Sequence, residues 1–209
     1  MDAIAPRQPT RIQQEKREQI LESALDLFSS QGFSGATLDR IAQAAGMSKP
    51  NLLYYFRRKD DIFAALIERL LDAWLEPLRA LDPAGDPLAE IAAYIRRKLE
   101  MARDLPRESR LFAGEILGGA PRILPLLEGE LKALVDEKAA LLERWMAEGR
   151  LRETDPRHLI FAIWATTQHY ADFDAQVLAV LGVERDGAER FEEATWFLED
   201  LFVKGLRPL

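Results

Sequence analysis

The sequence contains no cysteine and only two histidines, His158 and His169. The first absence excludes disulfides, thiol catalysis and cysteine-ligated zinc, and it favours a reducing, cytoplasmic location. Two histidines are too few for a histidine-rich metal cluster. We therefore expect neither a metal site nor a cofactor.

Long hydrophobic runs are also missing. In the C-terminal half, the longest stretch without a formal charge is His158–Ala171, which is too short to span a bilayer and contains glutamine and threonine. The N-terminus, MDAIAPRQPTR, lacks the apolar core of a signal peptide. We expect no membrane partner.

Enzyme motifs are absent as well. The sequence has no nucleophile elbow, no glycine-rich phosphate loop and no metal-binding motif. Most carboxylates fall on the solvent faces of expected helices, so we expect no enzymatic activity. A helical interaction protein that does not bind DNA is an alternative, which a positive gel shift on its own upstream region would exclude.

The 209 residues are 48% hydrophobic and 30% charged, as in a globular protein of one or two domains. The net charge of −7 is unevenly distributed. Residues 1–59 carry nine basic and six acidic side chains, a balance of +3, which leaves −10 for the remainder. This asymmetry indicates that only the N-terminal part meets a polyanion, unless it arises by chance.

The whole chain has the pattern of an all-α protein, because proline and glycine separate helix-periodic segments and no strand-like alternation persists. We expect a flexible arm over residues 1–10, a helix-turn-helix DNA-binding domain over 11–58, and a helical ligand-binding and dimerisation domain over 59–209. The expected helices cover residues 11–31, 38–45, 49–56, 59–81, 86–104, 108–117, 121–127, 130–148, 156–181 and 188–205.

The first three of these helices lie close together in the sequence, and the turn Gly46-Met47-Ser48 joins the second to the third. Thr37 and Ser48 stand where these two helices begin, and both are favourable N-cap residues. The arrangement is typical of a helix-turn-helix, whose third helix enters the DNA major groove while the second braces the backbone.

In that third helix, the apolar positions Leu52, Leu53 and Phe56 predict an inward face. Asparagine can read base edges, tyrosine and lysine bind phosphate, and a hydroxyl at a helix N-terminus adds backbone N–H donors. In the alternative interpretation, one tyrosine of the pair belongs to the core. The candidate DNA contacts are Thr37, Ser48, Lys49, Pro50, Asn51, Tyr54, Tyr55 and Lys59.

Four segments within residues 17–66 closely resemble the DNA-binding domain of TetR-family repressors: 20–28, 32–42, 45–56 and 59–63. The resemblance implies DNA contacts at the positions just listed, apart from Pro50, and places Phe28 and Phe56 in the core. It also implies a homodimer in which a ligand bound by the C-terminal domain moves the DNA-binding heads.

Apolar patterns in the C-terminal half support a dimer independently. Residues 130–148 carry a near-heptad stripe, and residues 156–181 are apolar on two faces, one for the subunit and one for a partner. Two helices from each subunit would form a four-helix interface. A monomeric core is the alternative. The candidate interface residues are Leu131, Leu134, Leu141, Trp145, Ile163 and Thr167.

Segments outside the helix-turn-helix, above all residues 158–173, look like one branch of the family, the repressors of pyrimidine utilisation. This resemblance runs nearly the full length of the chain. It implies a repressor of pyrimidine catabolism that uracil or thymine releases from operator DNA.

Uracil is small, flat and neutral, so its pocket needs aromatic walls and amide-like partners. Gln168 can pair with a ring N–H and the adjacent carbonyl, and Glu115 can accept the other N–H. For each aromatic residue, ordinary core packing is the alternative, and we expect His169 to be a structural or interface residue. The candidate ligand contacts are Trp74, Leu78, Phe112, Glu115, Trp164, Gln168, Tyr170 and Phe173.

Ala113 and Gly114 depart from this branch, which has larger sulfur-containing side chains after the Leu-Phe pair. Smaller side chains would enlarge the pocket. The alternative is therefore a TetR-like repressor that answers to a different small aromatic or acyl ligand.

Overall fold

The computed structural model describes residues 10–182 and 189–208, and the regular structure within these ranges is entirely helical, which confirms the all-α prediction. The chain divides into two compact units, 1–68 and 69–209, called the first and second unit below. Apart from Thr10, the expected N-terminal arm lies outside the described residues.

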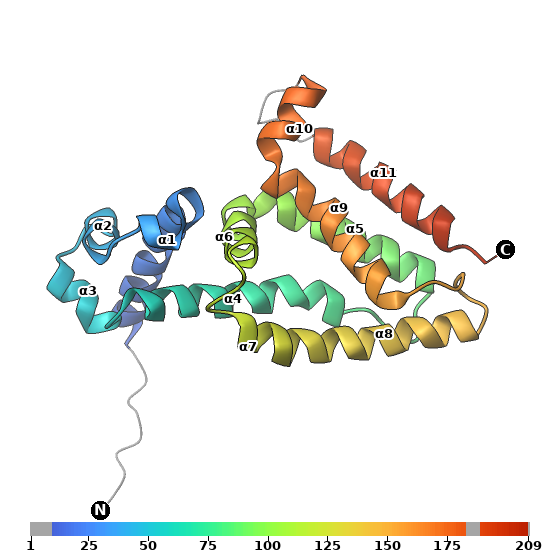
Figure 1. Ribbon diagram of the computed structural model, residues 1–209, viewed down its shortest axis with the longest axis horizontal. Coiled ribbons are helices and arrows are strands. Elements are labelled where there is room, and N and C mark those ends of the chain that lie inside the picture. Colours follow the sequence, from blue (N-terminus) through green and yellow to red (C-terminus); the bar gives the residue numbers. More distant parts are fainter. Residues whose placement is uncertain (1–9, 183–188, 209) are drawn as a thin grey trace, which may run out of the picture. The chain divides into compact units, whose positions relative to one another are not determined.

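The first unit contains three helices and the beginning of a fourth (Figure 1). These are α1 (Arg11–Gly35), α2 (Leu38–Ala44), α3 (Lys49–Tyr55) and α4 (Lys59–Arg79), the last of which continues into the second unit. The second unit contains α5 (Pro87–Asp104), α6 (Pro106–Leu117), α7 (Leu124–Leu126), a π-helical turn (Leu127–Leu131), α8 (Lys132–Ala147), α9 (Pro156–Asp172), α10 (Asp174–Leu181) and α11 (Glu189–Leu206).

The core of the first unit is built around aromatic rings. Phe28 of α1 stacks on Phe33 at 5.6 Å between ring centroids, and Phe63 of α4 packs edge-on against both rings. The backbone leaves helical geometry at Gly32, where φ is +70°, so the predicted break falls at the expected glycine. Helical geometry then resumes as far as Gly35, beyond the predicted end.

The turn between α2 and α3 also follows the local sequence. The hydroxyl of Thr37 accepts the backbone N–H of Arg40, and the hydroxyl of Ser48 accepts that of Asn51. Between the two helices, Gly46 has φ of +62°, a conformation that a side chain disfavours. Thr37 thus sets where α2 begins, and Gly46 and Ser48 set where α2 ends and α3 begins.

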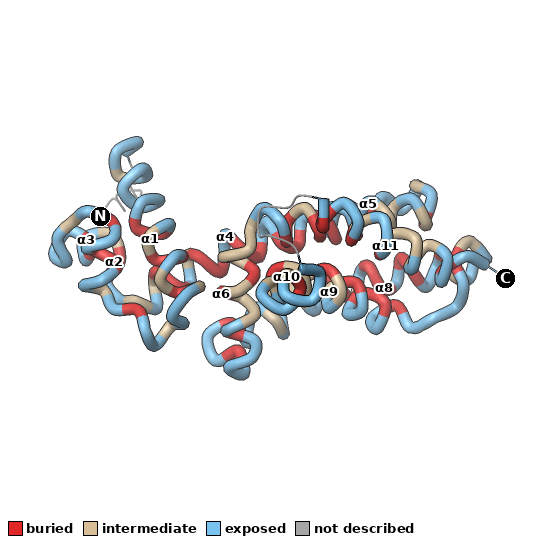
Figure 2. Tube along the Cα trace, turned by 90° about the horizontal axis from the view of Figure 1, so that it is seen from above, coloured by how far each residue is buried: buried red, intermediate tan, exposed pale blue. Residues whose placement is uncertain are grey.

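In the second unit, α5 packs against both α9 and α11, and α8 packs against α9. The main core cluster joins residues of α4, α5, α8, α9 and α11, and its largest fully buried side chain is Trp145. Buried positions on these helices face inward, whereas α10 is largely exposed (Figure 2). Asp86 and Asp155 cap α5 and α9, each followed by a proline.

The single helix predicted over residues 156–181 is wrong. It breaks at Phe173, whose φ of −111° and ψ of 29° separate α9 from α10. No proline or glycine signals the break, so helical periodicity does not detect it. The new direction brings Asp174 to an ion pair with Arg190 of α11, at 2.6 Å.

Across the two described ranges, none of the helices combines the length and the apolar character that a bilayer-spanning segment requires.

Candidate DNA-binding surface and effector site

The face of α3 that the sequence assigns to DNA is exposed to solvent. Only Leu52 of this helix is fully buried, while Lys49, Pro50 and Asn51 are exposed and Tyr54 is 70% exposed. Leu53, predicted to point inward, is 36% exposed, because the short helix has a narrow buried stripe. The surface is therefore wider than predicted and includes one apolar side chain.

Thr37, Ser48 and Lys49 also make polar contacts within the first unit. The two hydroxyls accept helix N–H groups, which leaves their own hydrogens free to donate to a phosphate. Nζ of Lys49 lies 2.9 Å from Oδ2 of Asp39, and both side chains are well exposed. Exposed ion pairs are worth about 0–1 kcal/mol, so a phosphate can displace the carboxylate.

The two tyrosines differ in their surroundings. Tyr54 accepts a hydrogen bond from Nε2 of Gln13 at 3.2 Å, whereas Tyr55 is half-buried and its ring meets that of Tyr54 edge-on at 5.1 Å. The more exposed hydroxyl, that of Tyr54, is thus positioned by the first helix.

Lys59 is engaged within the first unit. Its Nζ donates to the carbonyl oxygens of Phe33 and Ala36 at 2.7 and 2.8 Å, and it lies 4.2 Å from the centroid of the Phe33 ring. These contacts bind the start of α4 to the connection between α1 and α2. One N–H of the ammonium remains for a phosphate, so a DNA contact by Lys59 stays a prediction.

Sequence analysis missed some basic residues of the same unit. Arg57 and Arg58 are exposed directly after α3, and Arg58 pairs with Asp61 at 3.2 Å. Arg17 lies over the ring of Phe56, 4.1 Å from its centroid. In the sequence, Arg57, Arg58 and Lys59 form a cluster of positive charge directly after the predicted third helix, and this position could have identified them as candidate DNA contacts.

In the second unit, a polar cluster lies where α4, α5, α6 and α9 contribute side chains. Tyr94 and Lys98 are four residues apart on α5, as are Trp164, Gln168 and Asp172 on α9, so each set shares one helix face. The indole N–H of Trp164 donates to Oη of Tyr94 at 2.6 Å. α5 and α9 pack together, and Gln168 stands one helical turn from both Trp164 and Asp172 on α9.

Lys98 is an unusual core residue. It is 2% exposed, and its Nζ lies 4.5 Å from the centroid of the Trp74 ring, a cation–π contact with α4. Burial lowers the pKa of Lys98 to about 7, and the field of Asp172 offsets only part of that decrease. The amine is therefore half-charged near neutral pH, deep in the bundle.

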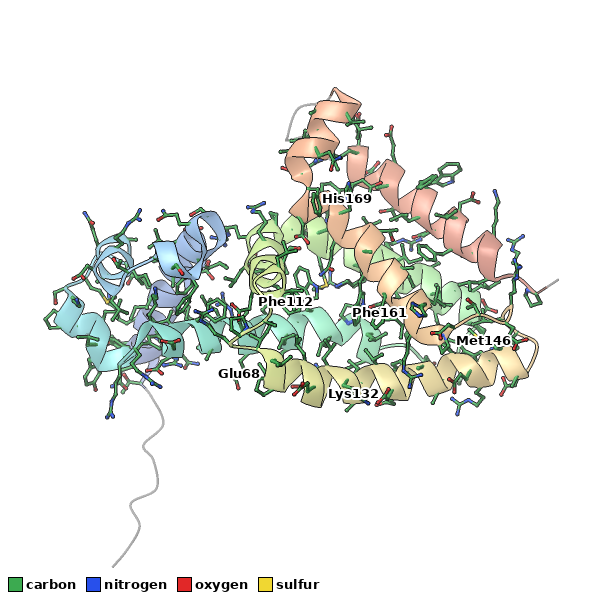
Figure 3. All side chains as sticks on the ribbon, in the orientation of Figure 1. Glu68, Phe112, Lys132, Met146, Phe161 and His169 are labelled. Atoms are coloured by element: carbon green, nitrogen blue, oxygen red, sulfur yellow. The ribbon has the colours of Figure 1, made fainter. Side chains whose placement is uncertain are left out.

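Asp172 and Ser109 connect α9 to α6. The hydroxyl of Ser109, which is buried, donates to Oδ1 of Asp172 at 2.5 Å. Burial raises the pKa of Asp172, while this hydrogen bond and the positive fields of Arg110, Lys98 and His169 lower it. In Figure 3, Phe112 marks α6 and His169 marks the last turns of α9, the two helices that this link joins.

Two of the predicted ligand contacts take part in this cluster, Trp74 through Lys98 and Trp164 through Tyr94. Leu78 is buried on α4, and the remaining ones on α6 and α9 are half-buried, namely Phe112, Gln168 and Tyr170. Tyr94, Lys98, Ser109 and Asp172 were missed, although the four-residue spacing of Tyr94 and Lys98 was a usable signal.

Two predicted ligand contacts lie elsewhere. Both carboxylate oxygens of Glu115 bind Arg122, one through its backbone N–H at 2.8 Å and one through its guanidinium at 3.1 Å. Glu115 thus holds the turn after α6 and is not a free acceptor. Phe173 is 54% exposed and stacks on His169 at 5.0 Å, so it does not form a wall within this chain.

The predicted dimer residues need a similar correction. Five of the six are buried in the core of the single chain, and Leu131 is half-buried. The five buried ones are Leu134, Leu141, Trp145, Ile163 and Thr167. These five side chains therefore have no surface left for a partner. Apolar periodicity predicts that a helix face is buried, but not whether the same chain or a partner covers that face.

Exposed apolar residues lie on other faces of the second unit. α9 exposes Phe161, near its beginning (Figure 3), and α11 exposes three large apolar side chains. Those of α11 are Trp196, Phe197 and Leu201. Phe197 and Leu201 are four residues apart, a spacing that the sequence analysis did not use.

Comparison with known proteins agrees with this division of the chain. A model described as "Bacterial regulatory proteins, tetR family" matches residues 20–66, and one described as "YcdC-like protein, C-terminal region" matches residues 67–209. The HTH-type transcriptional regulator RutR of Escherichia coli strain K12 is 49% identical over 193 residues, 92% of this chain and 91% of that protein. The nucleoid occlusion factor SlmA of Haemophilus ducreyi is 32% identical over 111 residues, 52% of this chain and 55% of that protein.

Solved structures show the same fold. AibR in complex with isovaleryl coenzyme A and operator DNA gives a TM-score of 0.73 at 19% identity, covering 89% of this chain and 97% of that one. A TetR-like transcriptional regulator from Rhodococcus sp. RHA1 gives 0.63 at 25% identity, covering 91% and 97%.

A helix-turn-helix with an exposed polar third helix, followed by a separate helical unit, defines a DNA-binding transcriptional regulator and not an enzyme. The chain belongs to the TetR family of transcriptional repressors. Members of this family bind operator DNA and small-molecule effectors and are typically dimers.

Proposed function

We propose that this protein is a cytoplasmic repressor of pyrimidine catabolism that uracil or thymine releases from a near-palindromic operator. One observation carries the choice of effector: a cluster of buried polar groups with aromatic neighbours lies in the second unit and includes the predicted ligand residues Trp74 and Trp164. Buried polar groups are costly unless they are paired, and a small polar ligand supplies that pairing.

The chemistry of the cluster suits a nucleobase. Trp74 and Trp164 offer flat apolar surfaces, and Gln168, one helical turn after Trp164 on α9, offers both an amide donor and an acceptor. The 49% identity to the regulator RutR over 92% of this chain supports the same assignment, together with the resemblance of residues 158–173 to the pyrimidine-utilisation branch.

The test is DNA binding to the promoter nearest the gene, measured by fluorescence anisotropy during titration with uracil and with thymine. Either base is expected to release the DNA. Gln168→Ala should bind the operator normally but need at least about tenfold more uracil, because it loses paired hydrogen bonds. Normal release from Gln168→Ala would contradict the assignment of Gln168, and no release from the wild type would contradict the effector.

A different small aromatic or acyl effector is the second candidate, because Ala113 and Gly114 are smaller than the side chains of the branch that this sequence resembles. Thermal-shift screening against nucleobases and acyl compounds would distinguish the candidates, since only a bound ligand stabilises the folded state.

We further propose that the exposed apolar faces of α9 and α11 form the homodimer interface. Phe161 of α9 and Phe197 and Leu201 of α11 are each about half exposed in the single chain, and large apolar side chains exposed on a helix face are typical of a protein interface. Two helices from each subunit would give a four-helix contact with twofold symmetry.

Phe197→Glu is expected to convert the dimer to a monomer, because it would bury a charge at the centre of an apolar contact. Analytical ultracentrifugation gives the oligomeric state. Ile12→Glu is the matched control, since Ile12 is equally apolar and is 66% exposed in the first unit. A Phe197→Glu protein that remains dimeric at micromolar concentration would refute this interface.

A further inference from the structure

We propose that Leu53 of α3 reads a thymine of the operator through the C5-methyl group of that base, and thereby specifies one base pair in each half-site. The inference rests on the proposed binding of operator DNA through α3. It goes further, because it assigns one side chain to a base edge and names the chemical group that is read.

Leu53 is the leucine of α3 that the chain leaves partly uncovered. It is 36% exposed, whereas Leu52 and Phe56, on the buried side of the same segment, are 0% and 3% exposed. The exposed part of an apolar side chain gains free energy when a partner removes it from water. A single exposed leucine is common on protein surfaces, so the assignment depends on what surrounds this one.

Pro50 lies three residues before Leu53 on α3, a spacing that makes the two side chains neighbours on the helix surface. Pro50 is exposed as well. Neither side chain donates or accepts a hydrogen bond, and proline also lacks a backbone N–H. Pro50 and Leu53, called the apolar patch below, thus interrupt a surface whose other exposed members, Lys49, Asn51 and Tyr54, are polar.

The surroundings of the apolar patch indicate a nucleic acid as the partner. Lys49 is exposed on α3, and Arg57 and Arg58 are exposed directly after it, so positive charge lies on both sides of Leu53 in the sequence. Such side chains bind phosphates and position a helix in the major groove, but they carry no sequence information. The residues between them are left to contact the base edges.

Only one group on the major-groove edge of the four bases is apolar, and it is the C5-methyl group of thymine. Every other edge presents hydrogen-bonding groups, which would lose water against the apolar patch and gain no partner in return. A thymine opposite Leu53 is therefore favoured by burial of its methyl group, and the other bases are disfavoured by desolvation.

The backbone that carries Leu53 is fixed before DNA binds. Oγ of Ser48 accepts the N–H of Asn51 at 3.4 Å, and the N–H of Phe56 donates to the carbonyl oxygen of Leu52 at 3.0 Å, so both ends of the short helix are held. Oη of Tyr54, the next residue, accepts a hydrogen bond from α1, through Nε2 of Gln13. A helix held in this way loses little conformational entropy on binding.

The experiment replaces each thymidine of the operator, together with its symmetry mate, by deoxyuridine. Deoxyuridine keeps every hydrogen-bonding group and lacks only the methyl group. At one position we expect the wild-type protein to bind about 15-fold more weakly, which is about fourfold for each methyl group in the two half-sites. Fluorescence anisotropy measures the affinity of the full-length protein.

Leu53→Ala should bind the thymine operator at least about 15-fold more weakly than the wild type, and the same deoxyuridine pair should then change its affinity by less than about twofold. Leu53→Met keeps an apolar side chain and should keep the dependence on the methyl group. The matched control is Leu117→Ala, because Leu117 is 84% exposed at the end of α6 in the second unit. This variant should behave like the wild type with both operators.

The inference is wrong if no deoxyuridine pair weakens binding of the wild type, or if the pair that does so weakens Leu53→Ala equally. In either case operator binding itself stands. If the wild type binds no fragment of the promoter nearest the gene, the proposed function fails and the inference falls with it. Far-ultraviolet circular dichroism establishes that each variant is folded.

Discussion

Lys49→Ala is expected to weaken operator binding by roughly 30-fold at physiological salt, about 1 kcal/mol for each of the two heads of a dimer. Lys49 is exposed in the first turn of α3, and its carboxylate partner, Asp39, is exposed as well. The loss should be uniform across operator sequences, because a phosphate contact carries no base information. The measurement is anisotropy between 50 and 200 mM salt, where the slope of log K against log salt should decrease by about two.

Lys132→Ala is the control for this change. Lys132 is also an exposed lysine paired with an aspartate, Asp136, but it lies on α8 in the second unit. Its removal should leave both the affinity and the salt slope unchanged. Equal losses in the two variants would mean that overall charge, and not the α3 surface, controls binding.

The DNA-binding surface was predictable because its signals are local. Thr37 and Ser48 cap helices and Gly46 adopts the left-handed turn, and each effect depends on residues within one helical turn. The charge balance of +3 in residues 1–59 pointed to the same part of the chain. A net charge of −7 for the whole chain does not oppose DNA binding when the acidic residues belong mainly to the other unit.

The effector site was only partly predictable, because its polar members become neighbours through packing. Lys98 follows Arg96 and Arg97 in the sequence and looks like one more solvated charge. Helical geometry turns it to the buried side of α5, while Arg96 pairs with Glu199 on the exposed side. Glu115 shows the converse, since an acid predicted to accept a ligand N–H is held instead by Arg122, seven residues later.

Dimer residues were mispredicted for a related reason. The stripe on residues 130–148 is real, but Leu134, Leu141 and Trp145 face the chain's own core. The apolar periodicity of a helix predicts which face is buried, but it does not tell whether the same chain or a partner covers that face. Fractional exposure in the folded chain provides part of that information, and our proposal of α9 and α11 rests on it.

Lys98→Met is expected to stabilise the folded protein by about 2 kcal/mol at pH 6, equivalent to a rise in Tm of several degrees. Lys98 is 2% exposed, and burial holds its pKa at about 7, well below the ordinary value for lysine. Folding therefore either buries a charge or removes a proton from the amine. Methionine fills similar volume without that cost, and Asp172 keeps the hydroxyl of Ser109 and the field of Arg110.

The sign of the pH dependence follows from the lowered pKa. Between pH 7 and about 10, the unfolded chain binds a proton at Lys98 that the folded chain does not, so wild-type stability rises with pH across this window. The advantage of Lys98→Met should therefore be largest below pH 7 and nearly vanish by pH 10. Thermal unfolding at several pH values measures it, with Lys132→Met as the exposed control. Destabilisation of Lys98→Met at every pH would mean that the amine stays charged and that its attraction to Asp172 stabilises the fold. A more stable variant with weaker uracil binding would instead show that the buried amine costs the protein stability in exchange for recognition.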